Sequence, residues 1–300
     1  MKVKTIEKII SKKFNEFLDS ISDERVKNLI KENTIITGGC IASMFLKEKV
    51  NDFDLYFTNK ETVLAVSEYY LNIFNKNNST SGYILDCDIY NKEQEKQEKP
   101  DFKEEGRIKI MFDSVGVQKE KGLDTENIHE LGDTIEIKED DGAKYRPVYL
   151  SSNAITLSTQ IQIIIRFYGE AEKIHDNYDF VHCTNYWLSK TEKLTVNQRA
   201  LECLLAKELH YIGSKYPLAS IIRIRKFVQR GWQINAGQIL KMAFQLSLLD
   251  LTDSKIMEDQ LVGVDLAYFG ALIDALNSRP NKDDSVLSYL YLSAIIEKIF

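Results

Sequence analysis

The sequence predicts an α/β protein, in which a head over residues 1–190 is built around a mixed sheet and an all-helical domain follows over residues 191–300. Two patterns lead to this prediction. In the first part, short apolar runs alternate with segments of helical periodicity, which is typical of strands and helices packed in layers. From about Thr195 onward only the helical spacing remains. The content of 44% apolar and 10% aromatic residues is ample for a packed core.

The first elements follow one another in a strand–helix order. Apolar residues three and four positions apart predict helices over residues 1–32. The run TIIT, closed by two glycines, predicts a strand, and residues 40–45 open the next helix. Residues 51–57 predict a second strand and residues 61–74 a further helix.

The middle of the chain carries a polar insertion over about residues 91–144. Strands are predicted on either side of its first part, over residues 81–89 and 107–112. Between them, residues 91–106 are almost entirely polar, which predicts an exposed loop. A group of strands is then predicted from Tyr145 onward, with a short helix after it.

Composition excludes several classes of protein. With 45 acidic and 39 basic residues the net charge is −6, so the chain is not expected to coat nucleic acid with its whole surface. The four cysteines lie far apart without a C-x-x-C pair, which argues against a disulfide framework or a zinc ribbon. No apolar run reaches the roughly 18 residues of a membrane span, and the amphipathic start does not resemble a secretory signal. We therefore expect a cytoplasmic protein without a membrane partner, and leave its oligomeric state open.

Four residues form the first candidate site. Gly38 and Gly39 lie between a predicted strand and a predicted helix, where backbone can approach a ligand closely and helix N–H groups can bind phosphate. Asp52 and Asp54 lie on the next predicted strand, two positions apart and therefore on one face. Adjacent carboxylates repel one another unless a cation lies between them, and Mg²⁺ prefers oxygen ligands. An ordinary turn and an ordinary strand edge are the alternative.

The stretch TGGCIASMFLKEKVNDFDLYF resembles the nucleotidyltransferase superfamily typified by DNA polymerase beta. The motif of that superfamily is a hydrophobic residue, glycine, and glycine or serine, followed about a dozen residues later by Asp-hydrophobic-Asp. The resemblance implies that Gly38 and Gly39 hold a nucleoside triphosphate and that Asp52 and Asp54 bind catalytic Mg²⁺. The implied reaction transfers a nucleoside monophosphate from the NTP to a hydroxyl acceptor and releases pyrophosphate.

A third carboxylate often completes such a site, and we predict that it is Asp179. The stretch around Asp179 resembles the arginine-aspartate-phenylalanine motif of tRNA CCA-adding enzymes and bacterial poly(A) polymerases, although Asn177 and Tyr178 replace its arginines. Asp179 lies on a strand-like segment that also carries His182, and the alternatives on other strand-like segments are Asp86, Asp88 and Asp113. An ordinary cap of a strand or turn is the other interpretation of Asp179.

The predicted helical tail carries a weaker resemblance to the CCA-adding enzymes. In HYIGSKYPLASIIRIRKFVQRGWQI, Arg223 and Lys226 fall at the spacing of that family, which implies that they bind nucleotide. With Arg225 and Arg230 they form the densest basic cluster of the chain, suited to phosphates of a nucleotide or an RNA. A solvated helix face is the alternative.

The acceptor is left open by the sequence. The family's Glu-Asp pair for base selection is missing here, and Leu218, Ala219 and Ser220 occupy that region. A tRNA 3′ end is the acceptor that the tail resemblance implies, whereas the acidic charge favours a protein hydroxyl, a small molecule or a second nucleotide. A non-catalytic binding or structural protein with an inherited fold is the alternative from another class.

Overall fold

A computed structural model gives the structure of residues 1–77, 82–87, 106–112, 135–136 and 144–251, with residues 256 and 260. The chain forms two compact units, which we call the first unit (residues 1–175 and 183–197) and the second unit (residues 176–182 and 198–300). The chain thus leaves the first unit after His175 and returns to it at Cys183.

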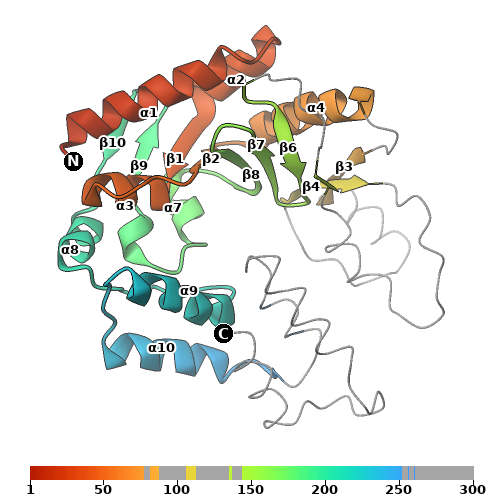
Figure 1. The fold of residues 1–300 in the computed structure, drawn as a ribbon. Helices are drawn as coiled ribbons and strands as arrows, with labels where there is room; N and C mark the ends of the chain where they lie inside the picture. Colours follow the sequence, from red (N-terminus) through yellow and green to blue (C-terminus); the bar gives the residue numbers. More distant parts are fainter. Residues whose placement is uncertain are drawn as a thin grey trace, which may run out of the picture. The chain divides into compact units, whose positions relative to one another are not determined.

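The first unit has an eight-stranded sheet in the order β10-β9-β1-β2-β8-β7-β6-β5 (Figure 1). Its strands are β1 (Thr34–Thr37), β2 (Phe53–Phe57), β5 (Ile135–Glu136), β6 (Pro147–Leu150), β7 (Ala154–Leu157), β8 (Ile161–Tyr168), β9 (Tyr186–Leu188) and β10 (Lys193–Thr195). β2 pairs with β8 in parallel and all other neighbours are antiparallel, so the predicted mixed sheet is confirmed. A separate hairpin joins β3 (Gly82–Asp86) to β4 (Ile108–Phe112).

The helices described in this unit are α1 (Val3–Leu18), α2 (Glu24–Asn33), α3 (Gly39–Leu46), α4 (Lys60–Asn77) and α7 (Ala171–His175). The helical spacing in residues 1–32 thus corresponds to two helices. The second begins where the Asp23 carboxylate accepts a hydrogen bond from the Val26 N–H (3.0 Å), an N-cap that satisfies one of the free donors of α2.

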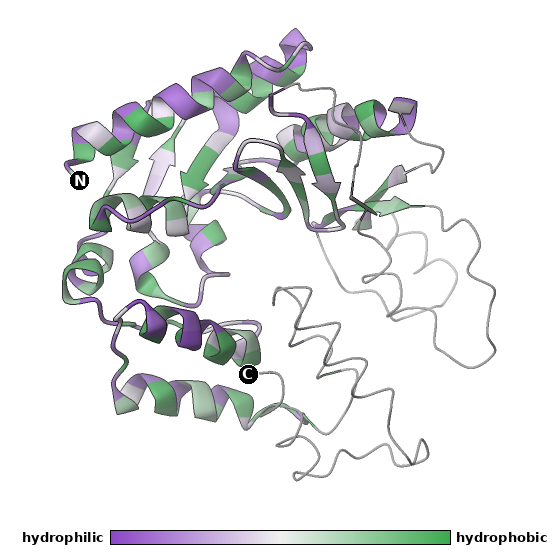
Figure 2. Cartoon of the chain, in the orientation of Figure 1, coloured by the Kyte–Doolittle hydropathy of each residue, from purple (hydrophilic) through white to green (hydrophobic). Residues whose placement is uncertain are grey.

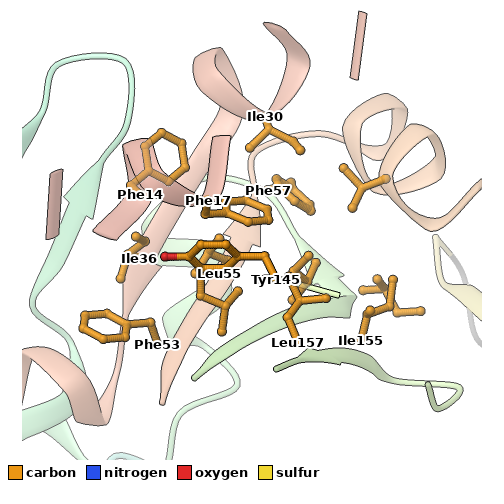
Figure 3. Close-up of a cluster of buried hydrophobic side chains, with 14 of the residues drawn as sticks. Phe14, Phe17, Ile30, Ile36, Phe53, Leu55, Phe57, Tyr145, Ile155 and Leu157 are labelled. Carbon is orange, nitrogen blue, oxygen red and sulfur yellow. The ribbon is translucent and has the colours of Figure 1, made fainter. Parts of the chain in front are cut away.

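The core lies between the helices and one face of the sheet. α1 is amphipathic (Figure 2), and its apolar face buries Ile6, Ile10, Phe14 and Phe17. Figure 3 shows side chains of these helices meeting side chains from the strands, among them Ile36, Leu55 and Leu157. Burial of large side chains such as these stabilises the fold by about 1.5–3 kcal/mol each.

In the second unit, helices α8 (Gln198–Ala206), α9 (Pro217–Gln229) and α10 (Ala236–Leu246) are described, and α9 packs against α10 (Figure 1). The helical pattern predicted from about Thr195 onward is interrupted after Ala206, because Lys207 adopts a left-handed backbone (φ 50°) and Glu208 forms an isolated bridge with Gln233. An all-helical domain remains a prediction for residues 261–300, which lie outside the described residues.

The structure describes only part of the predicted insertion over residues 91–144. Its strand over residues 107–112 is confirmed as β4, and β5 also falls within it. The predicted loop over residues 91–106 lies outside the described part of the chain except for Gly106. Among the described residues, no helix combines the length and the apolar character that crossing a membrane requires.

Candidate functional site

A row of polar residues crosses the sheet on the face opposite the core. In the strand registers, Thr37 of β1 lies opposite both Tyr186 of β9 and Asp54 of β2. Asp54 lies beside Gln162 of β8, which lies opposite Thr156 of β7. Residues directly opposite on neighbouring strands share a face, and successive residues of a strand alternate between faces. Asp54 therefore lies on the same face as Thr37 and Gln162.

The two predicted glycines form the turn between β1 and α3. Gly38 adopts φ 91° and ψ −148°, a backbone conformation that is accessible almost only to glycine. The Gly38 N–H donates to the Cys183 carbonyl (3.2 Å). Gly39 is the first residue of α3, and a Cβ added there would meet no atom within 4 Å. Open space thus borders the start of α3, where the first N–H groups of a helix lack intrahelical acceptors.

The two predicted metal ligands differ in their surroundings. Asp54 is partly buried within β2, whereas Asp52 is exposed just before the strand. Burial, and secondly the charge of Asp52, raise the pKa of Asp54 to about 7. Within the described part of the chain no hydrogen bond or ion pair reaches either carboxylate. The Asp54 carboxylate is therefore desolvated, and no hydrogen-bond donor compensates for the lost water. A divalent cation would stabilise its charged form instead.

The two carboxylates lie close enough to the start of α3 to affect the pKa of a buried thiol there. Burial raises the pKa of Cys40, the second residue of α3, well above its usual value, and the charges of Asp54 and Asp52 raise it further. Cys40 thus stays protonated and is not a nucleophile. No group of three or more His, Cys, Asp and Glu side chains suited to a metal occurs in the described ranges. A cation at this site would have Asp52 and Asp54 as its carboxylate ligands.

The other predicted site residues belong to the second unit. Asp179 lies in a bend rather than in the strand that its sequence suggested; only the following residue, Phe180, forms a bridge, to Tyr211. Arg223 Nη1 lies 2.6 Å from Asp179 Oδ2, in a pair with side chains 40% and 15% exposed, respectively. The structure therefore brings two predicted site residues together as an ion pair. Of the alternative third carboxylates, Asp86 pairs with Lys60 (2.7 Å); Asp88 and Asp113 lie outside the described residues.

The basic face of α9 is exposed next to a buried aromatic cluster. Lys226, like Arg225 and Arg230, is exposed, whereas Phe227 turns toward His182 and Trp232, with ring centroids 4.8 and 5.6 Å away. Burial lowers the pKa of His182 to about 4, so this ring is neutral. His182 lies in the short 3₁₀ helix η1 (Val181–Cys183) and not in the strand that we expected. These contacts give His182 a structural role.

Sequence reasoning missed three residues at the glycine turn and its sheet row. Gln162 lies beside Asp54, and the Thr37 hydroxyl, together with His175 Nε2 at 2.9 Å, lies directly before the turn. The signal for Gln162 was present, because it is a lone polar residue within the apolar run IQIII. No local signal identifies His175, which reaches Thr37 across 138 positions of sequence.

The geometry defines a mixed α/β protein in which Asp54 lies opposite Thr37, the residue before the glycine turn. Solved CCA-adding enzymes are similar to the chain at 12% identity. One is the Thermotoga maritima enzyme complexed with tRNA, with a TM-score of 0.39. The match covers 90% of this chain and 57% of that chain. Another, with CTP, has a TM-score of 0.38, covering 95% of this chain and 54% of that one.

The chain belongs to the Gabija anti-defense 2 family, whose family model matches residues 8–207. A curated relative, Gabija anti-defense 2 of Bacillus phage SPbetaL7, is 18% identical over 251 residues. The matched region is 83% of this chain and 46% of that relative, so the chain spans less than half the length of the curated protein.

Proposed function

We propose that the chain is a Mg²⁺-dependent nucleotidyltransferase that moves a nucleoside monophosphate from an NTP to a hydroxyl acceptor. The observation that carries the proposal is the register of β1 and β2. It sets Thr37, the residue before the glycine turn, directly opposite Asp54. The glycine turn and the carboxylate thereby become neighbours, as transfer of a nucleotidyl group from an NTP to an acceptor beside a metal ion requires.

Each group of the site has a distinct part in this reaction. The N–H groups of Gly39 and Cys40 bind phosphate oxygens of the NTP at the start of α3, where the helix dipole favours negative charge. Asp52 and Asp54 would hold Mg²⁺, which would supply Lewis-acid stabilisation of the phosphates and lower the pKa of the acceptor hydroxyl. The acceptor oxygen forms a bond to the α-phosphorus and loses its proton to solvent, while the bond from the α-phosphorus to the bridging oxygen breaks and pyrophosphate leaves. Gln162, beside Asp54, orients polar groups of the bound ligand.

The acceptor that we favour is a hydroxyl on a protein component of Gabija defence. The family name, which describes action against that defence, supports this choice. The net charge of −6 also favours a protein over a long polynucleotide, because binding of nucleic acid depends on cationic neutralisation of phosphates.

Transfer of label from α-³²P-labelled NTPs tests this proposal. Purified chain is incubated with Mg²⁺, each NTP in turn, and either the Gabija proteins or a tRNA lacking its 3′ end. We expect label on a Gabija protein with wild type and none with Asp52→Asn or Asp54→Asn. Label on tRNA alone would replace the protein acceptor by RNA, and equal labelling by wild type and Asp54→Asn would refute the metal assignment.

A second candidate, a non-catalytic binding protein, is favoured by one contact. Arg223, predicted to bind nucleotide, is instead engaged by Asp179, the predicted third carboxylate, at 2.6 Å. Calorimetry with Mg²⁺ and each NTP separates the two candidates. Binding that requires Asp54 supports the enzyme, whereas a folded wild-type chain that binds neither supports the non-catalytic protein.

A further inference from the structure

The Thr37 hydroxyl joins three segments of the first unit directly before the glycine turn. It lies 2.9 Å from His175 Nε2, 2.9 Å from the Asn185 carbonyl oxygen and 3.3 Å from the Cys183 carbonyl oxygen. Thr37 is completely buried. These contacts tie the end of β1 to the last residue of α7 and to the segment before β9.

Counting protons fixes the direction of the bond to His175. A hydroxyl has one proton to donate, and carbonyl oxygens only accept, so the Thr37 hydroxyl donates toward Asn185 or Cys183. With the hydroxyl proton placed there, the short contact with His175 is a hydrogen bond in the tautomer whose Nε2 carries the proton and donates to Thr37 Oγ1, and we assign that tautomer. The His175 ring also packs against Tyr186, with centroids 5.7 Å apart, on the same face of the sheet.

The same network sets the backbone of the turn. Gly38 N–H donates to the Cys183 carbonyl (3.2 Å), the residue whose carbonyl also faces the Thr37 hydroxyl. Two successive residues, Thr37 and Gly38, are thus held to one segment. This hydrogen bond of its N–H holds Gly38 at φ 91°. The chain then continues into α3, with the N–H groups of Gly39 and Cys40 at the start of the helix.

We propose that His175 is a positioning residue for the glycine turn, acting through the Thr37 hydroxyl. The His175 N–H donates to the oxygen of that hydroxyl, so the hydroxyl proton stays directed at the carbonyl oxygens of Cys183 and Asn185. The turn thereby keeps the conformation that we propose binds phosphate. The consequence for nucleotide binding rests on the proposed function; the positioning of the turn does not.

Amide hydrogen exchange of Gly38, whose N–H donates to the Cys183 carbonyl, tests the positioning directly in the nucleotide-free chain. We compare His175→Leu, which removes the donor, with His175→Gln, whose side-chain amide nitrogen can replace Nε2, and with Thr37→Val, which removes the hydroxyl at constant shape. Exchange at Gly38 should rise roughly three- to tenfold in His175→Leu and Thr37→Val, the range set by one net hydrogen bond, and be restored in His175→Gln. The double variant should be no faster than Thr37→Val alone.

Two controls keep the result specific. His210→Leu removes a histidine of the second unit, where it contacts Arg199, and should leave exchange at Gly38 unchanged. Should His175→Leu not fold, His175→Asn serves instead, because its amide is too short to reach the position of Nε2. Unchanged exchange at Gly38, or a rise spread evenly over the whole first unit, would overturn the positioning role.

Affinity for Mg²⁺–ATP separates this inference from the proposed function. With the function correct, His175→Leu should weaken nucleotide binding by the same factor while the affinity for Mg²⁺ alone stays that of wild type. A wild-type chain that binds no nucleotide, but whose turn exchanges faster in His175→Leu, would refute the nucleotide site and support the positioning role.

Discussion

Replacing Asp54 by Asn should abolish metal-dependent transfer and at the same time stabilise the metal-free protein at alkaline pH. Burial, with a smaller contribution from Asp52, raises the pKa of Asp54 from 3.8 to about 7. An acid whose pKa is higher in the folded than in the unfolded chain adds stability below the unfolded value, and that stability is lost as the pH rises through the folded value. Above pH 7 the ionised carboxylate therefore opposes folding.

The two pKa values give the magnitude. Proton linkage with 3.8 in the unfolded and about 7 in the folded chain makes the contribution of Asp54 to the free energy of unfolding about 2 kcal/mol larger at pH 5.5 than at pH 8. Asparagine does not titrate. The difference in unfolding free energy between wild type and Asp54→Asn should therefore shift by about 2 kcal/mol between these pH values, in favour of the variant at pH 8.

Urea unfolding followed by circular dichroism, at both pH values and with a chelator present, measures this shift. Added Mg²⁺ should then stabilise wild type more at pH 8 than at pH 5.5, because it binds the ionised carboxylate, and should have no such effect on Asp54→Asn. Asp52→Asn is the matched control: it removes only the smaller cause and should retain most of the pH dependence. A stability difference that is equal at both pH values would refute the burial argument, and equal stabilisation of Asp54→Asn by Mg²⁺ would refute the cation site.

Two further predictions concern the turn and the second unit. Gly38→Ala forces a side chain onto a backbone with φ 91°, so it should lower the free energy of unfolding by about 1–3 kcal/mol. Gly39→Ala adds a Cβ that meets no atom within 4 Å, so it should keep wild-type stability and weaken only nucleotide binding. Equal melting temperatures for the two variants would contradict the strain argument. In a double-mutant cycle with Asp179→Asn and Arg223→Leu, the pair should show a coupling energy of about 1 kcal/mol that falls in high salt, because Arg223 is 40% exposed; additive effects would show that the contact contributes nothing.

Local patterns were sufficient to predict the β1–turn–α3–β2 segment. A short apolar run marks β1, alternation marks β2, and the glycines at 38 and 39 lie where a turn is required. The same reasoning predicted the group of strands after Tyr145. In β2 the alternation places Phe53, Leu55 and Phe57 together in the core. All four residues of β1 are buried, which is why its sequence is a continuous apolar run between threonines instead of an alternating one.

Long-range pairing could not be predicted in the same way. The partner of β2 on its far side is β8, more than a hundred residues later, so nothing near Asp54 in sequence identifies Gln162 as its neighbour. The segment of residues 176–182 folds with the second unit although residues on both sides of it belong to the first. Its apolar residues suggested a strand, but they pack in an aromatic cluster, which requires no regular pairing.

The core fixes the geometry of the site, because both are set by the alternation of side chains along β2. Phe53, Leu55 and Phe57 are buried against the helices. Because successive side chains of a strand alternate between faces, this burial places Asp54 on the other face of the sheet. A shift of one residue in register would move the carboxylate into the apolar core and three large apolar side chains onto the polar face, at a cost of several kcal/mol. The position of Asp54 opposite Thr37 is therefore maintained by hydrophobic packing on the far side of the sheet. A site built in this way keeps its geometry without hydrogen bonds to the carboxylate itself, which leaves that carboxylate available to a cation.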